Sequence, residues 1–138
     1  MKPVTMRAIG TDEGDCLMAA AASILEIELA ELPPITRDND AEWFNVFRDA
    51  MRERGFDVVE RANDPPLAPN GYAIAIGLSP RNQGTENHAV VALDGAVVHD
   101  PHPTRTGISR IDYWLMLVPL ARTPARVSQL TSLDELEL

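Results

Sequence analysis

Three side chains that together can perform nucleophilic hydrolysis occur in this sequence in the order cysteine, histidine, acid. The chain has one cysteine, Cys16, which opens the apolar run CLMAAAASILEI. His88 and Asp100 flank the segment AVVALDGAVVH. A cysteine attacks as its thiolate, a histidine can take up the thiol proton, and an acid can orient that histidine. These residue types predict a triad with Cys16 as nucleophile, His88 as base and Asp100 as orienting acid.

The run from Cys16 to Ile27 predicts a helix buried in the centre of the domain, because it is rich in helix formers and apolar on nearly all sides. Asp15 stands where an N-cap residue belongs. A helix N-terminus stabilises negative charge, which favours a thiolate at Cys16. The alternative is that Cys16 is a small residue packed at the top of a buried helix, and this segment alone does not separate the two.

The segment 88–100 predicts a β-hairpin, and the length of its turn decides which side chains share a face. A two-residue loop at Asp94-Gly95 sends His88 and Asp100 to opposite faces of the sheet. A three-residue loop, Leu93 to Gly95, closed by a glycine bulge sets His88 directly opposite Asp100. The triad requires the second register. Otherwise the histidine only caps a strand and the acid only starts a turn.

The remaining segments predict an α+β fold. Apolar residues recur at helical spacing from Asp40 to Arg54, with Gly55 as the expected stop. The two prolines of LPPIT, residues 32–36, indicate a loop. Strands are predicted at 56–61, 71–79, 88–93, 96–100 and 111–118, the last apolar enough to be buried on both faces. We expect an antiparallel sheet with the Cys16 helix packed on it.

Two segments, GDCLMAAAASILEIELAELP at 14–33 and HAVVALDGAVVHDPHP at 88–103, resemble small bacterial and phage proteins of the papain-like cysteine hydrolase superfamily. The resemblance implies a papain-like fold over residues 1–121, followed by a tail at 122–138 that is a short helix or disordered. It places the nucleophile, base and acid on Cys16, His88 and Asp100. It also implies hydrolysis of a peptide, isopeptide or other amide bond through an acyl-enzyme, with no cofactor.

The sequence departs from that superfamily just upstream of the cysteine. There a side chain, often glutamine, commonly stabilises the oxyanion, but residues 1–15 contain no Gln, Asn or His. Candidates for this role or for substrate binding are the Cys16 backbone N–H, Thr11, Gln83, Asn87 and His102. A missing donor also fits a rival function, a non-catalytic binding protein with the same fold. Deamidation and acyl transfer would use the same triad.

A metal site is a further alternative, since His88, His99 and His102 with Asp100 and Cys16 include residue types that ligate zinc. In the register that the triad requires, His99 faces away from His88, and the prolines of HDPHP indicate a stiff turn. We therefore expect no metal.

The amino-acid composition limits the binding partners and the cellular compartment that we expect for this protein. The 138 residues carry a formal net charge of −9, which disfavours binding to nucleic acid or to anionic membranes. No stretch reaches the roughly 18 apolar residues that span a bilayer, and the start MKPVTMRAIG lacks a secretory signal pattern. We expect a cytoplasmic protein that acts on a peptide or protein substrate.

Overall fold

The computed structural model describes residues 1–6, 15–35, 40–62, 70–80 and 87–120. Within them the helical elements are α1 (Asp15–Leu25), η1 (Leu29–Glu31), η2 (Asp40–Glu42) and α2 (Trp43–Arg52). The strands are β1 (Phe56–Arg61), β2 (Tyr72–Leu78), β3 (Asn87–Leu93), β4 (Ala96–His99) and β5 (Arg110–Pro119). The predicted tail at 122–138 lies outside the described residues.

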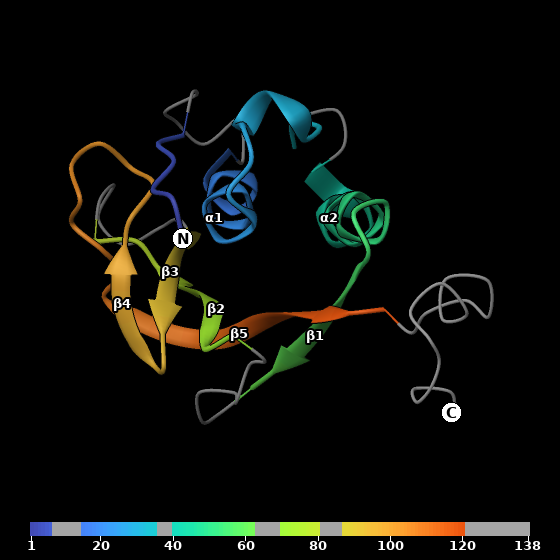
Figure 1. Ribbon diagram of the computed structural model, residues 1–138. Helices are drawn as coiled ribbons and strands as arrows, with labels where there is room; N and C mark the ends of the chain where they lie inside the picture. The colour runs from blue at the N-terminus through green and yellow to red at the C-terminus, as the bar shows by residue number, and fades with distance from the viewer. Residues whose placement is uncertain (7–14, 36–39, 63–69, 81–86, 121–138) are drawn as a thin grey trace.

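The fold is α+β, as the sequence predicts. The five strands form one antiparallel sheet in the order β1-β5-β2-β3-β4. Both α1 and α2 lie on the same side of this sheet (Figure 1). Each predicted strand is present, with its ends moved by at most one residue. Among the described residues, no helix is both long and apolar enough to cross a membrane.

Helix α1 is central because small side chains let it approach the sheet closely. Met18 and the four alanines of 19–22 have no solvent exposure, and the helix packs against β3. The helix ends at Leu25, two residues earlier than predicted. Glu26 adopts a left-handed conformation with φ of 59°, and the Ile27 N–H donates to the Ala22 carbonyl at 3.1 Å. This arrangement satisfies a terminal carbonyl and stops the helix.

Strand β5 is buried on both faces over its central residues, as its apolar sequence predicts. Leu115 and Leu117 join the core between the sheet and the helices. Trp114 points to the other face and packs in a second cluster with Val90 of β3 and three alanines of β2 and β3, Ala73, Ala75 and Ala92. Only the ends of the strand differ from the expectation, since Ile111 is 41% exposed.

The β3–β4 hairpin has neither of the two registers considered for it. Asp94 and Gly95 both have positive φ, 50° and 88°, and Leu93 pairs with Ala96, so the turn is the two-residue type that Asp-Gly favours. The three-residue loop, which the triad was expected to require, is therefore not formed.

A bulge in β4 then changes the register of this hairpin. Ala92 pairs with Val97 but Val91 pairs with His99, which leaves Val98 as an extra residue. Continuing this register by one residue puts Asp100 opposite Val90. Since side chains alternate along a strand, Asp100 and His88 then lie on the same side of the hairpin. The bulge supplies the geometry that the longer loop was expected to supply.

Candidate active site

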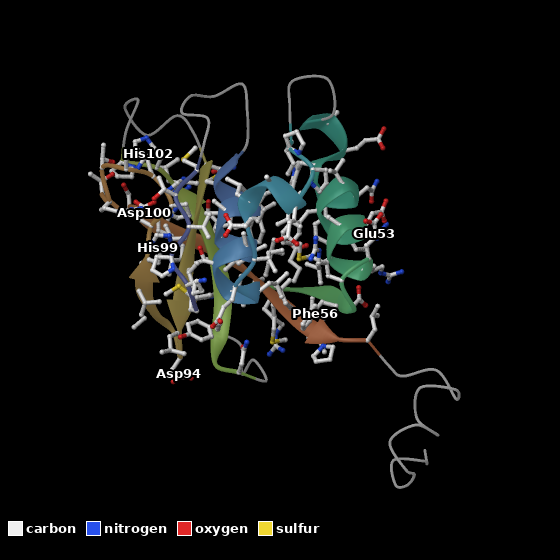
Figure 2. All side chains as sticks on the ribbon, turned by 45° about the horizontal axis from the view of Figure 1, so that its top comes forward. Glu53, Phe56, Asp94, His99, Asp100 and His102 are labelled. Atoms are coloured by element: carbon white, nitrogen blue, oxygen red, sulfur yellow. The ribbon has the colours of Figure 1, made fainter. Side chains whose placement is uncertain are left out.

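The three residues of the predicted triad come from three elements that meet at one end of the sheet. Cys16 is the second residue of α1, His88 is the second residue of β3, and Asp100 directly follows β4. Figure 2 shows Asp100 and His102 beside the start of α1, on the side of the molecule away from α2. The N-terminus of the central helix and the end of the bulged hairpin thus supply the site.

His88 and Asp100 form a buried pair. The distance from His88 Nε2 to Asp100 Oδ1 is 2.6 Å, and the two side chains are only 3% and 5% exposed. An ionised carboxylate can only accept a hydrogen bond, so Nε2 carries the hydrogen and donates it. The other ring nitrogen, Nδ1, is left to exchange a proton with a nucleophile.

The Cys16 thiol lies close enough to the His88 ring to raise the pKa of that ring. Because Nε2 is bound to Asp100, we infer that the thiol faces Nδ1. Cys16 is half-buried and is not in a disulfide. The structure therefore brings Cys16, His88 and Asp100 together in the order nucleophile, base, acid. Their catalytic roles stay predictions.

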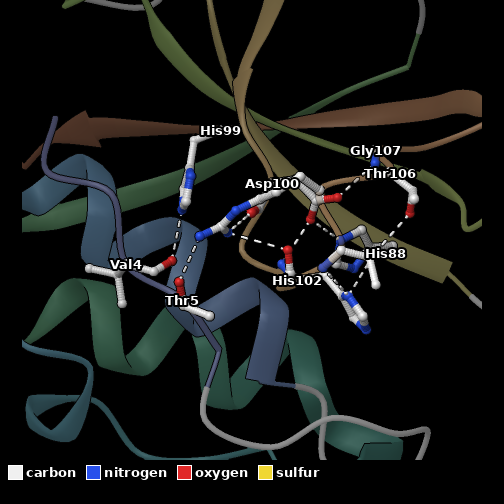
Figure 3. A network of polar contacts seen from close by, with 10 residues as sticks. Val4, Thr5, His88, His99, Asp100, His102, Thr106 and Gly107 are labelled. Atoms are coloured by element: carbon white, nitrogen blue, oxygen red, sulfur yellow. Dashed lines mark hydrogen bonds and ion pairs between the residues drawn. The ribbon is translucent and has the colours of Figure 1, made fainter.

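Asp100 is held by three N–H donors. Oδ1 accepts the His88 bond and a second bond from the His102 backbone N–H at 2.9 Å, and Oδ2 accepts from the Gly107 N–H at 2.7 Å (Figure 3). Burial alone would raise the pKa of this carboxyl, but the hydrogen bonds from His88, His102 and Gly107 outweigh it and lower the pKa to about 2. Asp100 is therefore ionised at neutral pH.

The electrostatics of His88 follow from its two neighbours. Desolvation is the largest single influence and would lower the pKa of the ring. The hydrogen bonds to Asp100 and Cys16, and the negative charges of both groups, act in the opposite direction and raise the pKa to about 9. The raised pKa means that the His88 ring favours the imidazolium form beside the Asp100 carboxylate at neutral pH.

A second histidine, His102, lies beside the pair. Its ring centroid is 6.1 Å from that of His88, with the planes at 82°. His102 Nδ1 accepts from the Thr104 backbone N–H at 3.1 Å and lies 2.9 Å from the Thr104 hydroxyl. A nitrogen that accepts from a backbone N–H cannot carry a hydrogen, so the proton of this ring is on Nε2.

His99 is turned away from the site and performs a structural task. Its Nε2 donates to the Val4 carbonyl at 2.8 Å, which ties the end of β4 to the N-terminal segment (Figure 3). Across the part of the chain that the structure describes, no three His, Cys, Asp or Glu side chains are grouped so that they could hold a metal ion.

Gly77 lies in β2, between β3 and β5, next to the site. It pairs with His88 on one side and with Ile111 on the other, where a bulge shifts the β2–β5 register. A Cβ at Gly77 would lie 1.6 Å from the Arg110 carbonyl oxygen. A close backbone approach and a bulge therefore occur together at this glycine.

The structure describes two of the four side chains proposed for oxyanion or substrate contacts. Thr11 and Gln83 lie outside the described residues. Asn87 is exposed at the start of β3, opposite Leu78. His102 is the one candidate side chain that the structure places against His88.

The backbone groups that hold the Asp100 carboxylate on the side away from His88 were not predicted. The Gly107 N–H and the turn at 102–107 were not predicted to take part, and neither was the N-terminal segment. Gly107 has a φ of 77°, so its residue type was a signal for a special backbone conformation there. No pattern links residues 1–6 to a turn about a hundred positions later.

Comparison of the chain with protein-family models, with curated proteins and with solved structures gives no significant match. The function is therefore proposed from the residues and geometry of the site.

Proposed function

We propose that this protein is a papain-like cysteine hydrolase that cleaves an amide bond through an acyl-enzyme on Cys16. The observation that carries the proposal is the buried His88–Asp100 pair, 2.6 Å apart, with the one thiol of the chain close enough to the histidine to raise the pKa of its ring. A nucleophile, a base and an orienting acid in contact are the parts that thiol-mediated acyl transfer needs.

In the proposed reaction His88 Nδ1 holds the proton of the Cys16 thiol, and the thiolate sulfur attacks the carbonyl carbon of the substrate. The tetrahedral intermediate collapses as the C–N bond breaks, and His88 gives its proton to the leaving amine. Water then attacks the thioester and gives its proton to His88, which releases the acid and restores the thiol. Asp100 keeps the ring oriented and stabilises the imidazolium throughout. The reaction needs no cofactor.

A peptide or isopeptide bond is the favoured substrate, by analogy with the superfamily that the sequence resembles. Side-chain deamidation and transfer of the acyl group to an amine share the same first steps. The cytoplasmic location stays an expectation from the sequence. The absence of Gln, Asn and His from residues 1–15 supports the rival function of a non-catalytic binding protein.

An acyl-enzyme trapping experiment tests the proposal. The protein would be mixed with a small activated ester, and its intact mass followed over time. We expect an acyl adduct that maps to Cys16, decays in water, and is absent from Cys16→Ser and strongly reduced in His88→Ala. An unmodified wild-type protein would support the binding-protein alternative. An adduct that forms equally in His88→Ala would show a thiol that reacts without the proposed base.

A further inference from the structure

Arg105 lies in the turn that follows Asp100, and its backbone conformation is unusual. Its φ is 56°, in the left-handed region that residues other than glycine and asparagine seldom occupy. Its backbone N–H donates to the His102 carbonyl at 3.0 Å, which closes the turn. An arginine in this conformation suggests that its side chain has a specific task here.

The guanidinium of Arg105 joins the turn to the N-terminal segment. One terminal nitrogen donates to the backbone carbonyls of Asp100 and His102, the latter at 3.3 Å. The other donates to the Thr5 hydroxyl at 2.9 Å (Figure 3). The planar fork of an arginine can reach these partners together, whereas a lysine ammonium is a point charge.

The N-terminal segment, residues 1–6, is itself bound to the helix that carries Cys16. The Lys2 N–H donates to the Ser23 carbonyl at 3.0 Å, and the Val4 N–H donates to the Ser23 hydroxyl at 2.9 Å. Ser23 is fully buried in α1. The Ser23 hydroxyl in turn donates to the Ala19 carbonyl at 2.8 Å.

The same segment is also bound to the end of β4. The Val4 carbonyl accepts from His99, and the Met6 N–H donates to the Pro101 carbonyl at 3.0 Å. Residues 1–6 therefore form a bridge between α1 and the residues around Asp100. Arg105 is the side chain that fastens the turn after Asp100 to this bridge.

We propose that Arg105 is a positioning residue of the site: by binding the carbonyls of Asp100 and His102 and the Thr5 hydroxyl, it fixes the Asp100 turn relative to the Cys16 helix. This inference rests on the proposed function for its catalytic consequence. Its physical basis is that the Asp100 carboxylate can stay 2.6 Å from His88 only while the backbone that carries it stays in place.

The test compares Arg105→Ala, Arg105→Gly and Arg105→Lys with wild type. The glycine variant relieves the left-handed backbone while removing the side chain, so it stays informative if Arg105→Ala folds poorly. Thr5→Val leaves Arg105 intact and removes only its hydroxyl partner. Arg52→Ala is the matched control, because Arg52 also carries one charge and binds a carboxylate, Asp57, but at the corner of α2 and β1.

Two readouts are needed. The first is the pKa of His88 from NMR titration of its imidazole, which is assignable because the chain has three histidines. The second is the rate of iodoacetamide labelling of Cys16. We expect the pKa of His88 to fall by roughly half a unit or more in all three Arg105 variants, and by less in Thr5→Val. Labelling should slow in parallel, and Arg52→Ala should match wild type in both readouts.

An unchanged His88 titration in folded Arg105→Ala and Arg105→Gly would overturn the positioning role, whatever the enzyme activity. If wild-type Cys16 labels no faster than a free thiol while the His88 titration still shifts, the proposed hydrolase function fails and the structural role of Arg105 stands. A shift in Arg52→Ala equal to that in the Arg105 variants would show a general charge effect and overturn the inference.

Discussion

His88 Nε2 and Asp100 Oδ1 lie 2.6 Å apart even though the turn that joins their strands would, by itself, send the two side chains to opposite faces. Val98, the extra residue of the β4 bulge, reverses this outcome. Because Val98 is bulged out and not paired with Val91, the base and the acid can meet. The bulge belongs to the site as much as the residues that it positions.

Deletion of Val98 should remove the bulge and keep the His88–Asp100 pair. Without the extra residue, Ala92–Val97 and Val91–His99 become consecutive pairs of one register, so Asp100 still lies opposite Val90 on the side of His88. We expect the pKa of His88 to stay near 9, measured by NMR titration. Val98→Ala is the control, since it keeps the residue count and changes a residue that is 46% exposed. A His88 pKa near its ordinary value of 6.5 in the folded deletion variant, with that of the control unchanged, would contradict this account of the register.

Asp100→Asn should weaken the hydrogen bonds at position 100 and lower the pKa of His88, although the two side chains have the same shape. The carboxylate accepts from His88, His102 and Gly107, so an amide would turn its NH₂ toward at least one of these donors. We expect a loss of roughly 1–3 kcal/mol in the free energy of unfolding and a lower pKa of His88, because the negative charge is gone. Urea unfolding and NMR titration measure the two effects.

The control for this substitution is Asp112→Asn, which changes an exposed carboxylate bound to Arg110. It should change stability far less and leave the pKa of His88 unaltered. A neutral effect of Asp100→Asn on both quantities would mean that the carboxylate charge plays no part at the site.

Stability should depend on pH through the His88–Asp100 pair. The pKa of His88 is raised from 6.5 to about 9, so its contribution is fully present below pH 6.5 and is lost as the pH rises through 9. The pKa of Asp100 is lowered from 3.8 to about 2, so its contribution is present above pH 3.8 and is lost as the pH falls toward 2.

Urea unfolding of wild type and His88→Gln across this range measures the His88 contribution by difference. Between pH 6 and 10 wild type should lose on the order of 3 kcal/mol more than the variant. Parallel pH curves for the two proteins would show that His88 does not have a raised pKa in the folded state.

Gly77→Ala should destabilise the protein and disturb the site at once. The added methyl would meet the Arg110 carbonyl of β5, and Gly77 pairs directly with His88. We expect a loss of roughly 2–3 kcal/mol in the free energy of unfolding and slower labelling of Cys16. Gly55→Ala is the comparison, because a Cβ there meets no atom within 4 Å and its φ of 91° alone carries a cost of about 1 kcal/mol. Labelling of Cys16 at the wild-type rate in a folded Gly77→Ala protein would show that the site does not depend on Gly77.

The local elements were predictable because their signals are local. The alanine-rich run defines α1, the alternation around Asp94-Gly95 defines the hairpin, and the continuous apolar run defines a strand buried on both faces. The three residues of the candidate site could be identified in the same way, from residue types placed at the start of a helix and on adjacent strands. These predictions needed only the preferences of short segments.

The features that were missed depend on contacts between distant segments. The Asp-Gly turn and the Val98 bulge each set part of the strand register, and the face on which Asp100 lies depends on both. The support of Asp100 by Arg105 and Thr5 joins residues a hundred positions apart. Such contacts form when the hairpin end, α1 and the N-terminal segment pack together, so no local pattern encodes them.

The most direct test of the proposed function is the rate of iodoacetamide labelling of Cys16 as a function of pH, in wild type and in His88→Ala. If Cys16 is an activated nucleophile, wild type should label quickly at about pH 6, where an ordinary thiol is almost wholly protonated, and His88→Ala should lose this reactivity. If both proteins label slowly at that pH and speed up together only near about pH 8.5, as a free thiol does, the proposed Cys16–His88–Asp100 hydrolase is contradicted.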